Sequence, residues 1–224
     1  MVLPLLAASD WGIAVALLVL MIVFLIVGFA IIQGTRAQLY WRKLVEQGDV
    51  TAIQALVGEE VQRWKTARAP RGMAPSVWHG VQGAELLEVK PDGVRLSAAA
   101  EGQYALVSGE RREVSTSLKE GMKLTARLAE MVLYDIPNVK LDYAQVDIYS
   151  TFRDGAGSAQ QCIISTVARR EVADTLDWDD LDAEEIVRAF GGRFRLDDRG
   201  NALPINPDAA GPSGVPAAFY KDDD

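Results

Sequence analysis

An uninterrupted run of apolar residues near the N-terminus constrains this chain more than any other feature. Residues 11–32 read WGIAVALLVLMIVFLIVGFAII and contain no charged side chain. Twenty-two helical residues rise about 33 Å, which matches the hydrocarbon thickness of a bilayer. Residues 11–33 are therefore predicted to form one transmembrane helix, preceded by a short segment, residues 1–10, outside the membrane.

A cleaved signal peptide is the main alternative to a retained anchor. It requires a basic start, a shorter apolar stretch and a small-residue cleavage site, whereas residues 1–10 contain no Lys or Arg. A retained anchor is therefore favoured. Residues 11–32 contain no ionisable side chain, which argues against a proton relay or an ion path through this helix.

The charges on either side of the apolar run predict its orientation. Asp10 is the one charged residue before it, and Arg36, Arg42 and Lys43 follow it. Because positive charge is retained on the cytoplasmic side, we expect a single-pass protein of the bacterial inner membrane. Its N-terminus would lie outside and its larger C-terminal part in the cytoplasm.

Aromatic and small residues in and beside the apolar run are candidate contacts with lipid or with a partner helix. Aromatic side chains suit the membrane interfaces, and small residues four apart allow close helix packing. With the basic residues, the predicted membrane and partner contacts are Trp11, Gly12, Ala16, Gly28, Arg36, Tyr40, Trp41, Arg42 and Lys43.

Charge is distributed unevenly along the rest of the chain, whose net charge is −8. Residues 36–72 carry seven basic and four acidic side chains, whereas residues 171–224 carry five and fourteen. The first piece could lie against anionic head groups, and the second would be repelled by them and by nucleic acid. We expect the lipid bilayer, and no nucleic acid, as a partner.

Helical periodicity follows the apolar run. Gly48 is a helix stop and Asp49 an N-cap, and residues 50–67 have the pattern of an amphipathic helix. A basic helical neck is predicted over residues 34–67. Two prolines and a glycine then predict a linker over residues 68–80.

Residues 81–198 are predicted to form a soluble α+β domain with a small antiparallel sheet and packed helices. Short strands separated by turns are expected to form an antiparallel meander; they lie near residues 82–90, 94–99, 103–108 and 111–116. A capping box at Ser117–Glu120 begins a helix over about 118–135. Alternating residues then predict a long hairpin, with strands at about 144–152 and 160–173.

A second capping box at Asp182–Glu185 predicts a further helix, which Gly191 and Gly192 end. Residues 199–224 are rich in Pro, Ala and Gly and predict an extended tail that orders, if at all, on another surface, such as that of another subunit. The last four residues, Lys221–Asp224, resemble part of an acidic epitope tag, so that no function is assigned to them.

No catalytic, cofactor or metal site is predicted. One cysteine, Cys162, and one histidine, His79, exclude an internal disulfide and a multi-histidine zinc site. Acidic residues between Asp174 and Glu185 lack the spacing of a calcium loop. Asp147 and Glu171 lack the lysine expected beside a nuclease site, and the chain has no P-loop, no G-x-G-x-x-G and no G-x-S-x-G motif.

These features predict a non-catalytic accessory or scaffold subunit of a larger bacterial inner-membrane complex, with integral membrane subunits as partners. In layout, with a span at Trp11–Ile32 and a basic edge at Arg36, Arg42 and Lys43, the chain resembles the H-type subunit of bacterial photosynthetic reaction centres. The resemblance implies an energy-converting complex, photosynthetic or respiratory, and covers no sequence motif of the domain. A membrane-tethered adaptor or chaperone-like module is the first alternative, and an enzyme with an unrecognised site the second.

Overall fold

A computed structural model describes residues 3–107, 109–154 and 157–208 of the chain. It is 46% helix and 27% strand, which confirms the mixed helix-and-sheet class. In chain order the elements are α1 (Leu3–Glu46), α2 (Val50–Thr66), α3 (Pro75–Gln82), β1 (Glu85–Val89), β2 (Gly93–Ala99), β3 (Gln103–Val107), β4 (Glu110–Ser115), α4 (Ser117–Glu130), the π-helix η1 (Met131–Asp135), β5 (Tyr143–Asp154), β6 (Gly157–Arg169), α5 (Arg170–Ala173), α6 (Ala183–Ala189), β7 (Arg195–Leu196) and β8 (Ala202–Leu203).

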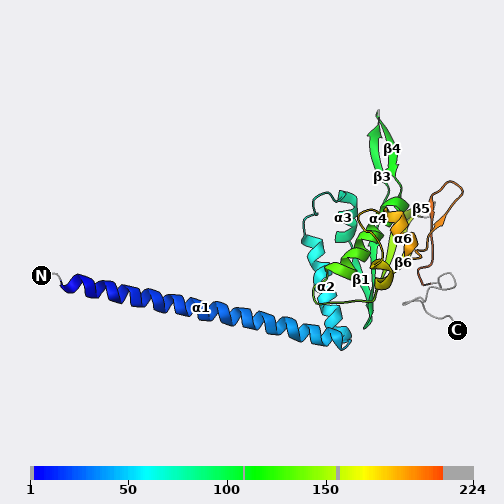
Figure 1. Cartoon of the computed structure of the whole chain (residues 1–224). Helices are drawn as coiled ribbons and strands as arrows, with labels where there is room; N and C mark the ends of the chain where they lie inside the picture. Colours follow the sequence, from blue (N-terminus) through cyan, green and yellow to red (C-terminus); the bar gives the residue numbers. More distant parts are fainter. Residues whose placement is uncertain (1–2, 108, 155–156, 209–224) are drawn as a thin grey trace.

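Helix α1 is a single rod that projects from a folded domain (Figure 1). It contains 44 residues, which corresponds to a length of about 66 Å. At its end Gly48 adopts a φ of +72°, and Asp49 caps α2 by accepting hydrogen bonds from the amides of Thr51 and Ala52. The predicted helix after Asp49 is therefore confirmed, and α2 turns across the end of α1.

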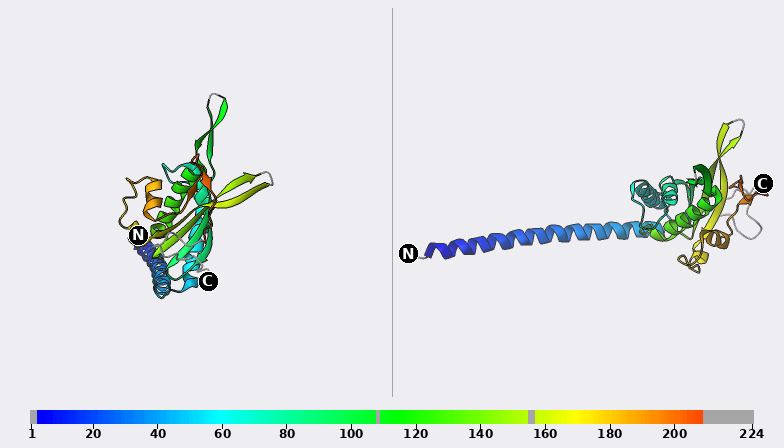
Figure 2. Two further views of the ribbon diagram at one scale, coloured as in Figure 1. Left: turned by 90° about the vertical axis from the view of Figure 1, so that its right-hand side faces the viewer. Right: turned by 90° about the horizontal axis from the view of Figure 1, so that it is seen from above.

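The main sheet has the strand order β1-β2-β5-β6. Strands β1 and β2 are antiparallel, β2 and β5 are parallel, and β5 and β6 form the predicted long antiparallel hairpin. The predicted four-stranded meander, and with it the purely antiparallel sheet, is wrong. Strands β3 and β4 form a separate two-stranded ribbon that projects from the body (Figures 1 and 2). Helix α4 then carries the chain back across one face of the sheet, and this crossover makes β5 parallel to β2.

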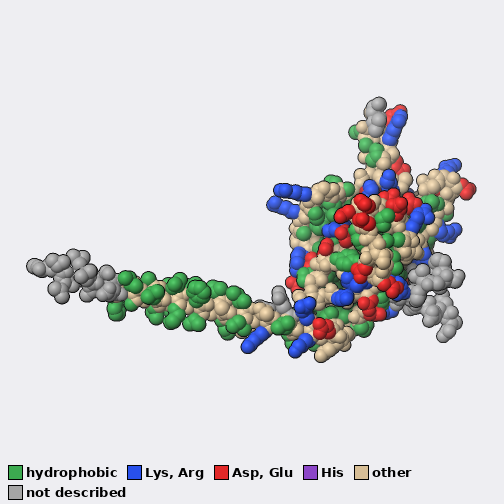
Figure 3. Space-filling model, in the orientation of Figure 1, with side chains coloured by type: hydrophobic (Ala, Val, Ile, Leu, Met, Phe, Trp, Pro, Cys, Tyr) green, Lys and Arg blue, Asp and Glu red, His purple; other side chains and the backbone are tan. Residues whose placement is uncertain are grey.

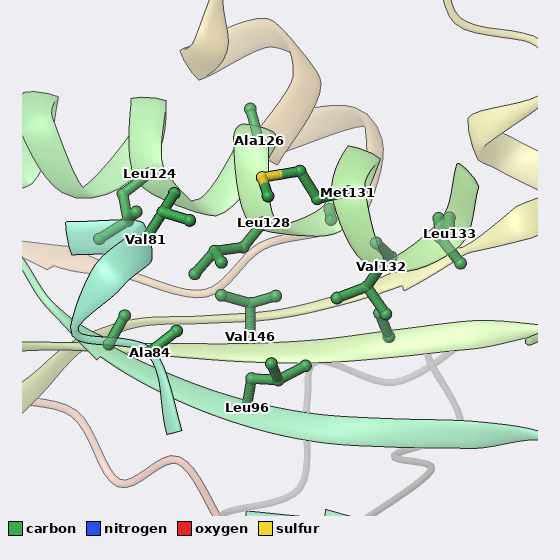
Figure 4. Packing of buried hydrophobic residues seen from close by; sticks show 14 of the residues in the cluster. Val81, Ala84, Leu96, Leu124, Ala126, Leu128, Met131, Val132, Leu133 and Val146 are labelled. Atoms are coloured by element: carbon green, nitrogen blue, oxygen red, sulfur yellow. The ribbon is translucent and has the colours of Figure 1, made fainter. Parts of the chain in front are cut away.

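The core lies between α4 and the sheet (Figure 4). Gly121 permits a close approach, because a Cβ atom there would stand only 2.9 Å from Cδ1 of Ile164 on β6. Helices α2 and α3 contribute to the same core cluster as the sheet. Side chains that are at most 1% exposed include Ile53, Val57, Val81, Leu96, Leu124, Leu128, Val146, Ile148, Ile163 and Ile164.

Two local features of the fold differ from the sequence-based predictions, and a third confirms one. Helix α3 occupies the second half of the segment predicted to be a linker, and it begins at Pro75, because proline suits the first turn of a helix. Helix α4 is capped by Thr116, whose side chain accepts from the amide of Lys119, so the predicted capping box at Ser117 is wrong. The capping box of Asp182 and Glu185 is present at α6.

The chain after α6 runs along the edge and over one face of the sheet. Ser165 on β6 and Arg193 form a two-way backbone bridge, and the amide of Ile205 donates to the carbonyl of Cys162 at 2.8 Å. Residues 199–208 thus contact the chain's own domain. The rest of the predicted tail, including Lys221–Asp224, lies outside the described residues.

Candidate functional site

The apolar segment of α1 is the most conspicuous surface feature of the molecule. Residues Trp11–Gln33 have a mean hydropathy of 3.4, and none of this stretch is buried against the chain itself. Figure 3 shows hydrophobic side chains exposed along the visible face of the helix. A core helix of a soluble protein would be buried, so that reading does not apply. The helix is long and apolar enough to cross a membrane; a signal sequence passes the same test.

The structure places all nine predicted contact residues along α1 and away from the domain core. Trp11 is 76% exposed, Tyr40 61% and Trp41 36%. Added Cβ atoms at Gly12 and Gly28 would meet nothing within 4 Å. Both glycines therefore leave open the close approach that a second helix would need. The remaining predicted contacts, Ala16, Arg36, Arg42 and Lys43, are also exposed.

The β3–β4 ribbon, called the arm below, is a second exposed apolar surface. Tyr104 is 52% exposed, Leu106 79% and Val114 58%. The Arg111 guanidinium lies over the Tyr104 ring, 4.3 Å from its centroid. An isolated two-stranded ribbon is marginally stable in water, so the arm depends on how its base is attached to the body.

Glu120, on the first turn of α4, attaches the arm to the body. Its carboxylate accepts hydrogen bonds from Ser76 on α3 at 2.7 Å, Gln103 on β3 at 2.7 Å, Ser115 on β4 at 2.6 Å and Lys123 on α4 at 2.8 Å. Burial opposes the charged form, but the hydrogen bonds from Lys123, Ser115 and Ser76 outweigh it and lower the pKa of Glu120 to about 2. Because hydrogen bonds from these four side chains occupy the carboxylate, Glu120 holds the arm to the body, as a clamp, and is not available as a general base.

A second buried carboxylate lies on the sheet face opposite α4. Asp147 on β5 is fully buried; its Oδ2 accepts from Nε of Arg95 at 2.6 Å, and its Oδ1 accepts from the Gln145 amide at 3.2 Å. Arg95 also pairs with Asp208 at 2.7 Å. These hydrogen bonds and ion pairs offset part of the cost of removing both charges from water.

Residues 205–208, which end in a turn at Pro207 and Asp208, lie over this polar face. Guanidinium nitrogens of Arg193 donate to the carbonyls of Asn206, at 3.3 Å, and Pro207, at 2.9 Å. The amide of Ile205 donates to Cys162, and Asp208 reaches Arg95. The Arg95–Asp147 pair therefore fixes the C-terminal segment to the sheet.

The residues considered for catalysis or metal binding have structural surroundings. Burial, with the Asp147 carboxylate nearby, raises the pKa of Cys162 to about 12, so its thiol stays protonated at neutral pH. Glu171 lies on α5 beyond the end of β6, whereas Asp147 sits in mid-strand opposite Ser165. His79 is exposed on α3.

The acidic residues between Asp174 and Glu185 stabilise local structure. Asp174 accepts from the Tyr134 hydroxyl at 2.7 Å, Asp177 accepts from the amides of Asp179 and Asp180, and Asp182 caps α6. Over residues 3–107, 109–154 and 157–208, no group of three or more His, Cys, Asp and Glu side chains could hold a metal ion.

Comparisons of the chain with protein-family models, with curated proteins and with solved structures find no match. Function has therefore to be inferred from the geometry and charge of the chain itself. The arm, the Glu120 clamp and the Arg95–Asp147 pair were not identified from the sequence. Tyr104 and Leu106 alternate with small or polar neighbours, but that pattern also fits a strand inside a sheet.

Proposed function

We propose that the protein is a non-catalytic, single-pass accessory subunit of a larger bacterial inner-membrane complex, photosynthetic or respiratory, with its domain in the cytoplasm. One observation carries the proposal: 23 successive residues of α1 bury none of their apolar surface in the chain's own fold. Removing apolar surface from water is the main driving force of association and folding. The surface of α1 therefore needs lipid and neighbouring helices to cover it.

Two surfaces support contact with partner subunits. Gly12, Ala16 and Gly28 offer small side chains along α1, where a transmembrane helix of another subunit can pack closely. The arm offers Leu106 and Val114 on the domain side. Exposed apolar groups on a projecting ribbon are typical of a protein contact.

The state of the buried carboxylates supports a role without catalysis. A general acid or base must reach a substrate proton, whereas the Glu120 and Asp147 oxygens already accept hydrogen bonds from the chain's own side chains. We propose that both groups hold the contact surfaces in place.

The test is gentle solubilisation of the native membrane and identification of the proteins that stay bound to the full chain. A matched variant replaces residues 11–33 by a Leu/Ala helix of equal length, which keeps the anchor but changes its packing surface. We expect the native chain to retain integral membrane subunits and this variant to lose them while remaining in the membrane. If the Leu/Ala variant retained the same subunits, α1 would serve only as a membrane anchor, and its surface would not bind partners.

A membrane-tethered adaptor is the second candidate, and residues 205–208 favour it. These residues lie on the polar sheet face and are held there through Arg95, Arg193 and one backbone hydrogen bond. A client peptide could take their place. If the protein is an adaptor, it should be a monomer after solubilisation, and the Asp208→Ala variant, in which residues 205–208 are loosened, should capture soluble clients. An accessory subunit should instead stay in its complex.

A further inference from the structure

The segment between α2 and α3 differs in charge from the rest of the domain. No Asp or Glu occurs from Val61 to Ala84, whereas four Lys or Arg residues do. Residues 85–208 carry 15 Lys and Arg against 23 Asp and Glu. Net positive charge in the domain is thus confined to the last residues of α2 and the loop that follows, residues 65–72, together called the basic loop below.

The basic loop is held rigidly by its backbone while its charged side chains remain exposed. The carbonyl of Ala67 accepts from the Trp78 indole and the Gln82 amide, both at 3.1 Å. Lys65, Arg68 and Arg71 are exposed, and no ion pair involves them in the described part of the chain. The neighbouring Arg63, in contrast, pairs with Glu60 at 3.0 Å.

The basic loop lies on the side of the domain that faces back along α1. Figure 1 and the right-hand view of Figure 2 both place the α2–α3 connection at the edge of the domain nearest the N-terminal end of α1. Lys and Arg side chains protrude there in Figure 3. One exposed acid on α2, Glu59, lies between this loop and the end of α1.

The geometry of α1 brings this edge within reach of a membrane surface. The apolar segment ends at Gln33 and the helix at Glu46, so the helix emerges by about 20 Å. The interfacial layer occupies the first 5 to 7 Å or so of that length. Helix α2 then turns across the end of α1, and its far end brings the loop back along α1 toward the apolar segment. A helix tilt of about 20°, average for a membrane span, narrows the gap further when it lowers this edge of the domain.

We infer that the basic loop is a second membrane contact, in which Lys65, Arg68 and Arg71 bind the head groups of anionic phospholipids. This contact rests on the proposed function, since it requires α1 to be inserted. Each basic residue near an anionic surface favours the bound orientation about five-fold, so three favour it by roughly two orders of magnitude. The contact would fix the orientation of the domain and therefore the direction of the arm.

The test uses the full chain in nanodiscs, with a fluorophore on Ala69→Cys, an exposed position inside the loop. Native Cys162 is buried and stays unlabelled. Quenching by a lipid carrying a head-group nitroxide is compared in discs of phosphatidylcholine alone and discs with about one-third phosphatidylglycerol. We expect at least two-fold stronger quenching in the anionic discs, and its loss in about 0.5 M salt, where charges are screened within a few ångströms.

Matched charge changes separate the loop from the overall charge of the protein. Arg68→Glu/Arg71→Glu should abolish the difference between discs, and Arg68→Lys/Arg71→Lys should keep it. Arg195→Glu/Arg199→Glu, an equal change at exposed residues on the β7–β8 side of the domain, should also keep it. Circular dichroism verifies folding of each variant.

The outcomes distinguish the loop contact from the anchor. Equal quenching in both kinds of disc, or a difference that survives Arg68→Glu/Arg71→Glu, overturns the lipid contact and leaves the anchor intact. Protection of the label only in the native complex would assign the loop to an acidic protein surface and also overturns it. Failure of the chain to enter any disc overturns the anchor, and the loop contact with it.

Discussion

Helices α1 and α4 are both rich in apolar side chains, but they differ in what covers them. Helix α4 is covered by the sheet and by helices α3 and α6, and its residues Leu124 and Leu128 are at most 1% exposed. The segment Trp11–Gln33 of α1 is apolar on every side and covered nowhere. An amphipathic helix can be satisfied by its own domain, whereas a helix that is apolar all round needs an apolar environment from elsewhere.

The two helices also differ in whether they can accommodate a charged side chain. Helix α4 carries a buried carboxylate, Glu120, because four side chains donate hydrogen bonds to it. Between Gly12 and Ile32, α1 has neither charges nor side-chain donors that could compensate for one. Stability of the domain and retention in the membrane should therefore respond to different substitutions.

The largest effect is expected from truncation in the core. Leu128→Ala should lower the free energy of unfolding of the domain by about 2–5 kcal/mol, because it leaves a cavity in a packed interior. Denaturant unfolding in detergent, followed by fluorescence of the buried Trp64 and Trp78, measures the change. The matched variant Leu20→Ala, on α1, should alter this free energy by less than about 0.5 kcal/mol. Equal losses from both variants would mean that α1 packs on the domain.

A charge in α1 should have the next largest effect, on membrane retention and not on folding. Leu20→Arg places a guanidinium near the middle of the span, which costs about 3 kcal/mol for insertion. The fraction of the chain that resists carbonate extraction measures the change, and Leu20→Ala serves as the control. Full retention of the Arg variant would contradict a span that faces lipid at this position.

Acid should weaken the domain through Glu120. Its pKa in the fold, about 2, is below the ordinary value of 4.5, so the stabilisation is complete above about pH 5 and is lost as the pH falls through 2. This shift in the pKa of Glu120 corresponds to a contribution of roughly 3 kcal/mol to the free energy of unfolding. The control, Glu120→Gln, should be less stable at pH 7 and should show a smaller loss between pH 5 and 2. An unchanged acid dependence in this variant would assign the effect to other carboxylates.

The smallest effect on stability is expected from the arm. Leu106→Ser alters a side chain that is 79% exposed, and the free energy of unfolding should change by less than about 0.5 kcal/mol. The same denaturant experiment measures it, beside Leu128→Ala as the reference. A loss above 2 kcal/mol would show that the arm contributes to the core in solution.

Local patterns in the sequence predicted the local elements of the fold. The apolar run, the amphipathic helix after Asp49 and the alternating strands around Gly155 each depend on residues close together in the chain, and periodicity reports such elements directly. The parallel pairing of β2 with β5 could not be read in this way. Gly93 pairs with Tyr143, fifty residues later, and no short-range pattern encodes that register.

The candidate contact sites show the same difference between local and long-range information. The nine residues of α1 were predicted as contacts from transmembrane patterning, which is local, and they stay a prediction because the same stretch does not encode what they would contact. Glu120 was taken for a capping residue because Ser117 precedes it by three positions. In the fold, donors from α3 and the arm reach this carboxylate instead. Tertiary donors of this kind become visible only when distant segments are brought together.

The unbroken course of α1 from Gln33 to Glu46 sets a helical phase between the face of α1 that would meet a neighbouring helix in the proposed complex and the face of the domain that carries the arm. Each residue of an α-helix advances the chain by about 100° of rotation. A single residue inserted between these points would swing the arm by more than a quarter turn around the axis, whereas an insertion of seven would restore its bearing almost completely. The number of residues in this connection is thus itself a determinant of which neighbour the arm can meet.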